Sequence, residues 1–146
     1  MNHSFLFEPG VWVGAGTFWT ADAQPLTAEA RTAITHREEC WLLAGSLRVL
    51  SSPPVEFVNH YSIEPPQKEL AALKWTAETS ATGKLQGTFS VVGPSILSVY
   101  RSSEGSAQYQ GTESLTQINP HHYEACGVLL LDGRRLSSWR VALTRS

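Results

Sequence analysis

Turn-forming residues recur at short, regular intervals along this chain, and this spacing constrains the fold more than any other feature. The clusters separate segments rich in Val, Thr, Tyr, Trp, Phe and Ile, which suit β-strands. They are Asp22 to Pro25, Ser51 to Pro54, Pro65-Pro66, Thr82-Gly83, Gly93-Pro94, Glu104-Gly105, Asn119-Pro120 and Asp132-Gly133. Short strands at a spacing of about 8–12 residues are typical of all-β sandwiches and barrels. Because the connections leave little room for crossovers, we expect an all-β fold: a closed antiparallel up-and-down β-barrel of about ten strands.

Size and charge narrow the class of protein. The 146 residues suit a single β-barrel domain spanning residues 1–146. A net charge of −2, with no run of like charges, predicts no binding to nucleic acid or to a membrane. Cys40 and Cys126 show no metal-binding or redox spacing, and the N-terminal residues do not resemble a signal peptide. We therefore expect reduced cysteines and a cytoplasmic protein.

Two segments leave room for helix. Gln67 to Trp75 contains good helix formers, but its apolar positions also alternate, and its strand-like neighbours favour a strand. The residues before Pro9 are expected to form a short helical turn that closes one end of the barrel.

The last third of the chain predicts which side chains point inward. Asp132-Gly133 predicts a two-residue hairpin that pairs Leu131 with Arg134. Polar residues alternate along Ala107 to Thr116 and must face water, which sends Glu113 inward. Tight turns at Glu104-Gly105 and at Pro120-His121 then extend the inward face to neighbouring strands. The predicted inward set is Ser98, Tyr100, Tyr109, Glu113, Leu115, Cys126, Val128, Trp139, Val141 and Leu143.

This inward set mixes apolar and polar groups, which is typical of a ligand cavity rather than of a filled core. An unpaired buried carboxylate costs several kcal/mol, so Glu113 needs a partner. A tyrosine hydroxyl, a cation or a bound ligand would serve, and a salt bridge to Arg101 or Arg140 is the structural alternative. The predicted ligand-binding residues are Ser98, Tyr100, Tyr109, Glu113, Cys126 and Trp139.

The two chain ends carry a family resemblance. The first strand reads Gly10-x-Trp12-x-Gly14-x-Gly16, and the last runs from Leu136 through Trp139 to Arg145. This pairing resembles the calycin superfamily of lipocalins and fatty-acid-binding proteins. The resemblance implies that Arg145 lies over Trp12 as a cation–π plug at one barrel end.

Within that superfamily the chain is most similar to nitrobindin-type bacterial barrels, and Arg37-Glu38-Glu39 resembles their second strand. Those proteins bind haem through a histidine of the final strand. Ser138 stands at the matching position here, and no histidine follows His122. We therefore expect neither haem nor another cofactor.

Few residues outside the predicted cavity suggest chemistry. The adjacent His121 and His122 are expected in a solvated turn, and His60 is expected to be an ordinary strand residue; inward, it would be a general base or ligand contact. No metal-binding cluster or nucleophile motif appears. Inside the cavity, Glu113 and Tyr100 would form an acid–base pair, because burial raises the pKa of a carboxyl group.

Three functional hypotheses follow. The first is intracellular binding of a small hydrophobic or amphipathic ligand in the barrel. The second is a cofactor-independent isomerase, cyclase or decarboxylase that uses Glu113 and Tyr100 as catalytic residues. The third is a structural or interaction module with a filled barrel. An apolar outer patch at Trp41-Leu42-Leu43 would favour a homodimer.

Overall fold

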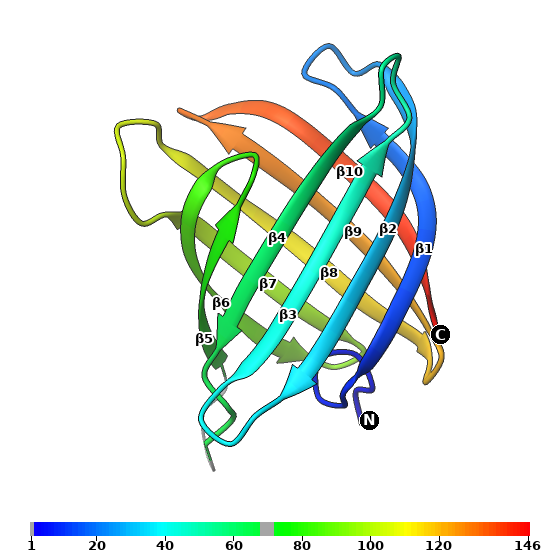
Figure 1. The fold of residues 1–146 in the computed structure, drawn as a ribbon, viewed down its shortest axis with the longest axis vertical. Helices are drawn as coiled ribbons and strands as arrows, with labels where there is room; N and C mark the ends of the chain where they lie inside the picture. The colour runs from blue at the N-terminus through cyan, green and yellow to red at the C-terminus, as the bar shows by residue number, and fades with distance from the viewer. Residues whose placement is uncertain (1, 68–71) are drawn as a thin grey trace.

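The computed structural model describes residues 2–67 and 72–146, which form a closed β-barrel (Figure 1). Each strand pairs antiparallel with the next, and β10 pairs with β1 to close the sheet. The predicted all-β, ten-strand, up-and-down barrel is confirmed. The part of the chain that the structure describes contains no helix able to span a bilayer. The strands are β1 Gly10–Trp19, β2 Pro25–His36, β3 Trp41–Val49, β4 Val55–Ile63, β5 Ala72–Thr79, β6 Gly83–Val92, β7 Ser95–Ser102, β8 Tyr109–Asn119, β9 His122–Leu131 and β10 Arg134–Arg145.

The predicted turn clusters coincide with connections between these strands, but none of them predicts the β2–β3 connection over residues 37–40. Arg37-Glu38-Glu39, which resembles part of a second strand, lies in that connection instead. Asp132 and Gly133 have φ angles of 50° and 82°, as a two-residue hairpin with left-handed central residues requires. Leu131 pairs with Arg134, as predicted. At Glu104-Gly105, however, the chain forms a longer loop over residues 103–108 rather than a tight turn.

Two β-bulges overturn the predicted facing of β9. The register shifts between Gln117 and Asn119 in β8, and again between Arg135 and Ser137 in β10. The bulge in β8 shifts the β8–β9 pairing by one residue, so Glu113 lies opposite Gly127 rather than Val128, and the bulge in β10 shifts the β9–β10 pairing by one residue. The prediction that Cys126 and Val128 point inward is therefore wrong.

The first residues of the chain close one end of the barrel, but not as a helix. Leu6 has a φ of 71°, which breaks a right-handed helix, and the segment forms turns over residues 5–7 instead. Phe5 and Leu6 are nearly fully buried. The Tyr123 hydroxyl contacts His3 Nδ1 at 2.7 Å and donates to Gln117 Oε1 at 2.8 Å.

The same end carries the predicted plug. The Arg145 guanidinium carbon lies 5.9 Å from the centre of the Trp12 ring, and Trp12 is fully buried. Arg145 also donates to the Pro9 carbonyl at 2.8 Å, which ties the N-terminal segment to the last strand. The Trp12–Arg145 contact implied by the resemblance is therefore present.

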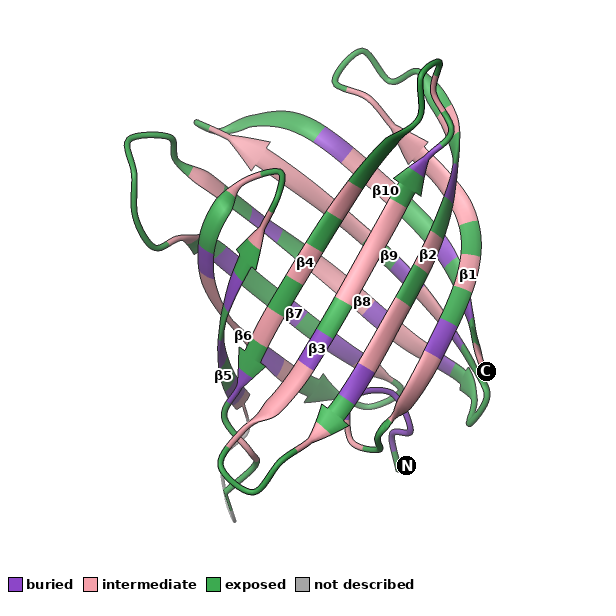
Figure 2. Cartoon of the chain, viewed as in Figure 1, coloured by how far each residue is buried: buried purple, intermediate pink, exposed green. Residues whose placement is uncertain are grey.

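Burial alternates along the strands, because successive side chains point into and out of the barrel (Figure 2). The second half of the segment 67–75 belongs to β5, as favoured, whereas residues 68–71 lie outside the described residues. The predicted outer patch at Trp41-Leu42-Leu43 is wrong. Leu43 is buried within the core cluster, and Trp41 packs against that cluster and stacks on His36.

Candidate functional site

A cavity of about 550 Å³ occupies the barrel interior, within the usual range for small-molecule sites. Its lining runs from Phe5 at the plugged end to Thr20, Ala21, Ala81 and Thr82. These four residues lie in the connections after β1 and β5, and therefore at the opposite end of the barrel. The filled-barrel hypothesis is wrong, because side chains leave this volume open.

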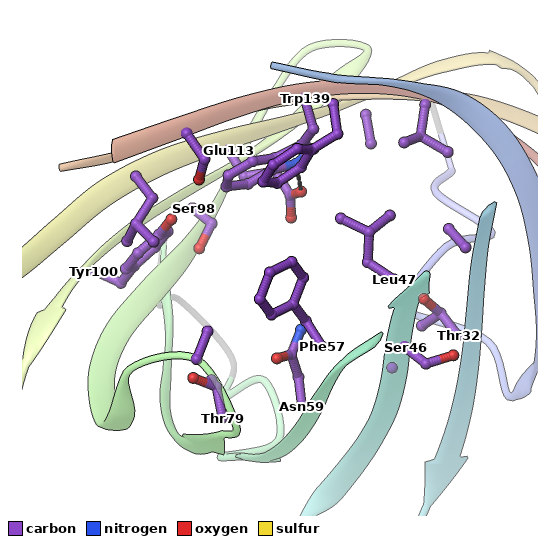
Figure 3. Close-up of a pocket in the computed structure, with 18 of the residues that line it drawn as sticks. Thr32, Ser46, Leu47, Phe57, Asn59, Thr79, Ser98, Tyr100, Glu113 and Trp139 are labelled. Carbon is purple, nitrogen blue, oxygen red and sulfur yellow. Dashed lines mark hydrogen bonds between the residues drawn. The ribbon is translucent and has the colours of Figure 1, made fainter. Parts of the chain in front are cut away.

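Most of the cavity surface is apolar, and polar side chains are distributed among the apolar ones (Figure 3). Phe18, Leu47, Phe57, Phe89 and Leu129 represent the apolar part. The polar side chains are Thr20, Thr32, Ser46, Asn59, Tyr61, Thr79, Thr82, Ser98, Tyr100, Glu113, Ser137 and Trp139. Among these described lining residues, Glu113 is the only aspartate, glutamate, lysine, arginine or histidine.

Glu113 and Trp139 form the central polar contact of the site. The Trp139 indole Nε1 donates to Glu113 Oε2 at 2.7 Å, and both residues lie opposite Gly127 in the sheet. Burial raises the pKa of the Glu113 carboxyl group above its ordinary value, and the Trp139 hydrogen bond partly opposes the rise. The remaining exposure of Glu113 faces the cavity.

Two glycines make room for the large rings of the site. A Cβ atom at Gly127 would lie 2.3 Å from Trp139 Cζ2, and one at Gly111 would lie 2.5 Å from the Tyr100 hydroxyl. Both distances are far below van der Waals contact, so only glycine lets these rings lie close against the sheet. Gly127 thereby helps to place the indole where it reaches Glu113.

Two tyrosines face the same carboxylate from other strands. Tyr100, from β7, donates its hydroxyl to the Val128 carbonyl at 3.3 Å. Tyr61, from β4, packs against Trp75 with ring centres 4.7 Å apart. Burial raises the pKa of both phenols, and the Glu113 charge raises it further. Both groups therefore remain neutral phenols at physiological pH.

Four of the six predicted binding residues line the cavity: Ser98, Tyr100, Glu113 and Trp139. Figure 3 shows Ser98 and Tyr100 on the same side of the cavity as Glu113. Tyr109 instead packs at the margin of the core cluster and is not part of the lining. The prediction that Cys126 binds the ligand is wrong, because the bulge in β8 turns this residue to the outer face of the barrel. Its side chain is exposed, and both Cys126 and Cys40 are free thiols.

The salt-bridge alternative for Glu113 is wrong. Arg140 points outward and pairs with Glu124 on the neighbouring strand. Arg101 is also exposed on the outer surface. His60, His121 and His122 are exposed as well, as expected for a strand surface and a turn.

Sequence reasoning missed the contribution of β4. Phe57, Asn59 and Tyr61 alternate along this strand and all line the cavity. Two aromatic residues and the buried Ile63 share this face, whereas Glu56 and His60 lie on the other face. That aromatic alternation is the signal that could have identified the inward face of β4.

The residue that matches the haem-binding histidine of the nitrobindin-type barrels lies outside the cavity lining. Ser138 does not line the cavity, because Ser137 and Trp139 on either side of it take the inward positions. The described lining contains no histidine, cysteine or methionine; of the side chains that bind haem iron in proteins it contains two tyrosines, Tyr61 and Tyr100. Nor do the described residues bring together three His, Cys, Asp or Glu side chains in a metal-binding group.

Comparisons with known proteins show the fold alone. No family model and no curated protein matches the chain. The structure is similar to that of Rv2717c from M. tuberculosis, with a TM-score of 0.67, 10% identity and coverage of 94% of this chain and 92% of that one. It is also similar to the S-type phycobiliprotein lyase CPES from Guillardia theta, with a TM-score of 0.62, 12% identity and coverage of 95% and 88%. The chain therefore shares its overall fold with both.

Proposed function

We propose that this protein binds a small hydrophobic or amphipathic organic molecule inside its barrel. The observation that carries the proposal is the cavity of about 550 Å³, whose wall is mainly apolar and which holds a single carboxyl group. Apolar walls bind the body of a ligand, and a few polar groups orient it. Glu113, Tyr100, Tyr61 and Ser98 are the orienting groups, and Trp139 supplies both ring surface and an N–H donor to Glu113.

The test is native mass spectrometry of protein purified from its own host, beside the same sample after denaturation. We expect an additional non-covalent mass that is lost on denaturation. The same spectra report whether the protein forms the homodimer that its sequence suggested.

A matched pair of variants links that mass to the cavity. Ala30 lines the cavity, whereas Ala33 lies three residues further along β2 on the outer face. Ala30→Phe should therefore lose the bound mass, and Ala33→Phe should keep it. Equal occupancy in both folded variants would place the ligand elsewhere and contradict the proposal.

A second candidate function is cofactor-independent isomerisation, cyclisation or decarboxylation. The observation in its favour is a buried carboxyl group of raised pKa that shares its cavity with the neutral phenol of Tyr100. The structural similarity to CPES adds that an enzyme can use the same barrel. Under this hypothesis Glu113→Gln keeps the affinity for a neutral substrate within a few-fold and abolishes its turnover. Unchanged turnover in that variant would exclude it.

A further inference from the structure

We propose that the molecule held in this cavity is a hydrophobic amine, with its nitrogen placed as an ammonium group against Glu113. This inference rests on the proposed binding function and names the chemical class of the ligand.

The charge of Glu113 has no partner in the cavity. No lysine, arginine or histidine occurs among the described lining residues. The nearest arginines along the strands, Arg101 and Arg140, lie on the outer face. A carboxylate enclosed by apolar walls is costly unless a proton or a cation neutralises it, so a positive group in the cavity would stabilise the ionised form of Glu113.

The hydrogen bonding of Glu113 is also incomplete. Among the described residues, Trp139 is the only side chain that donates to this carboxylate, and it donates to Oε2 alone. The Tyr100 hydroxyl is directed to the Val128 carbonyl instead. Since an ionised carboxylate accepts about four hydrogen bonds, it retains the capacity to accept those of an ammonium group.

The ring surfaces around this carboxylate suit a cation as well. Trp139, Tyr100 and Tyr61 line the same cavity from β10, β7 and β4. The faces of aromatic rings carry negative potential and attract ammonium groups, most strongly where water is excluded. A carboxylate combined with several aromatic rings therefore favours an alkyl or aryl ammonium group over a neutral head group.

The same features disfavour an anionic ligand such as a fatty acid. A ligand carboxylate would lie in a cavity that already holds a like charge and offers no cation. It would enter only if one of the two carboxyl groups were protonated. The cavity therefore has the opposite charge preference to that of a site built for fatty acids.

Proton balance gives the proposal a distinct signature. The side chains that face Glu113 from β4, β7 and β10 are Tyr61, Ser98, Tyr100 and Trp139, and none of them changes charge near neutral pH. When an ammonium ion binds to the protonated form of Glu113, one proton leaves the carboxyl group for solvent. Amine affinity should therefore rise with pH as this carboxyl group ionises, whereas alcohol affinity should stay nearly constant.

The experiment is isothermal titration calorimetry with ligands that share one apolar body and differ in one group. The first series is 1-naphthylmethylamine, 1-naphthalenemethanol and 1-naphthoic acid, and the second is octylamine, octanol and octanoic acid. At about pH 8 we expect the amine of a series to bind about tenfold more tightly than its alcohol, and the acid most weakly. Between about pH 5 and pH 8 the ratio of amine to alcohol affinity should increase.

Two variants assign the preference to one carboxylate. Glu113→Gln should reduce amine affinity about tenfold and leave alcohol affinity within a few-fold of wild type. Glu124→Gln is the matched control, because Glu124 lies on the outer face of the neighbouring strand, and it should leave both affinities unchanged.

The outcomes separate the two proposals. Alcohol and acid binding without a preference for the amine would overturn the amine assignment and leave the binding function intact. Failure of every compound in both series to bind would overturn the binding function itself. The pH dependence is read on wild-type protein, so the test remains decisive even if Glu113→Gln does not fold.

Discussion

The hydrogen bond between Trp139 and Glu113 makes a measurable prediction about stability. Its length is 2.7 Å, and its acceptor is a carboxylate inside the barrel. A hydrogen bond to an ionised group contributes about 1.5–3 kcal/mol to the free energy of unfolding, and a neutral one about 0.5–1.5 kcal/mol. The Trp139–Glu113 pair should therefore show a coupling energy in the upper range at high pH.

A double-mutant cycle isolates this energy. Trp139→Phe removes the N–H donor, Glu113→Met removes the acceptor, and the double variant removes both. The loss of indole surface occurs in both arms that carry Trp139→Phe, so it cancels in the cycle. Urea unfolding followed by far-ultraviolet circular dichroism gives the free energy of unfolding of each protein without depending on tryptophan emission.

We expect a coupling energy of about 1.5–3 kcal/mol at about pH 8. Because burial raises the Glu113 pKa, acidification protonates this group early and should reduce the coupling to that of a neutral hydrogen bond. Independent sites are additive to within about 0.5 kcal/mol. A coupling energy below that limit at about pH 8 would refute the hydrogen bond between Trp139 and Glu113.

Three further predictions concern the surroundings of this contact. Folding raises the Glu113 pKa above its ordinary value of 4.5. The wild-type protein should therefore lose stability as the pH rises from the pKa of Glu113 in the unfolded chain to its pKa in the folded protein. The loss is at most about 1.4 kcal/mol per pH unit. Glu113→Gln should therefore gain stability relative to wild type over that interval, and a gap that does not change with pH in urea unfolding would contradict the assignment. Gly127→Ala should displace Trp139 and shift its fluorescence. Gly45→Ala is the control, because its Cβ would meet no atom nearer than 3.6 Å, and it should leave the spectrum unchanged. Equal spectra for the two variants would argue against the close contact between Gly127 and the Trp139 ring. Arg145→Met should lower stability by about 1 kcal/mol, since it removes the cation over Trp12, and a thermal melt identical to that of wild type would show that the plug contributes nothing.

The barrel could be predicted from the sequence because the residues that form each turn are adjacent in the chain. Each turn signal acts over two to four residues, and the pair Asp132-Gly133 adopts the left-handed conformation that its sequence indicates. A meander needs no long-range information beyond the order of its strands, since every strand pairs with the next. Closure of β1 on β10 followed from the chain ends, where Trp12 and Arg145 meet.

The part of the site that escaped prediction depends on distant contacts. Tyr61 and Asn59 lie on a strand whose inward face was not assigned, although the alternation of Phe57, Tyr61 and Ile63 carried the signal. The opposite error affected Cys126, which was placed by counting residues through a turn. Counting fails wherever one strand gains a residue, and a bulge leaves little trace in composition.

The two bulges also explain why Glu113 and Trp139 both point inward as predicted, although the predicted pairing of their strands with β9 is off by one residue. Glu113 was placed inward by the polar alternation of its own strand, which does not depend on pairing. Trp139 was placed inward by counting first from β8 to β9 and then from β9 to β10. The bulge near Gln117 introduced an error of one residue, and the bulge after Arg135 introduced a second that cancels the first in β10. Only β9, which lies between the two bulges, was turned inside out. Gly127 therefore takes the inward position predicted for its neighbour Cys126, and its missing side chain is what admits the Trp139 ring.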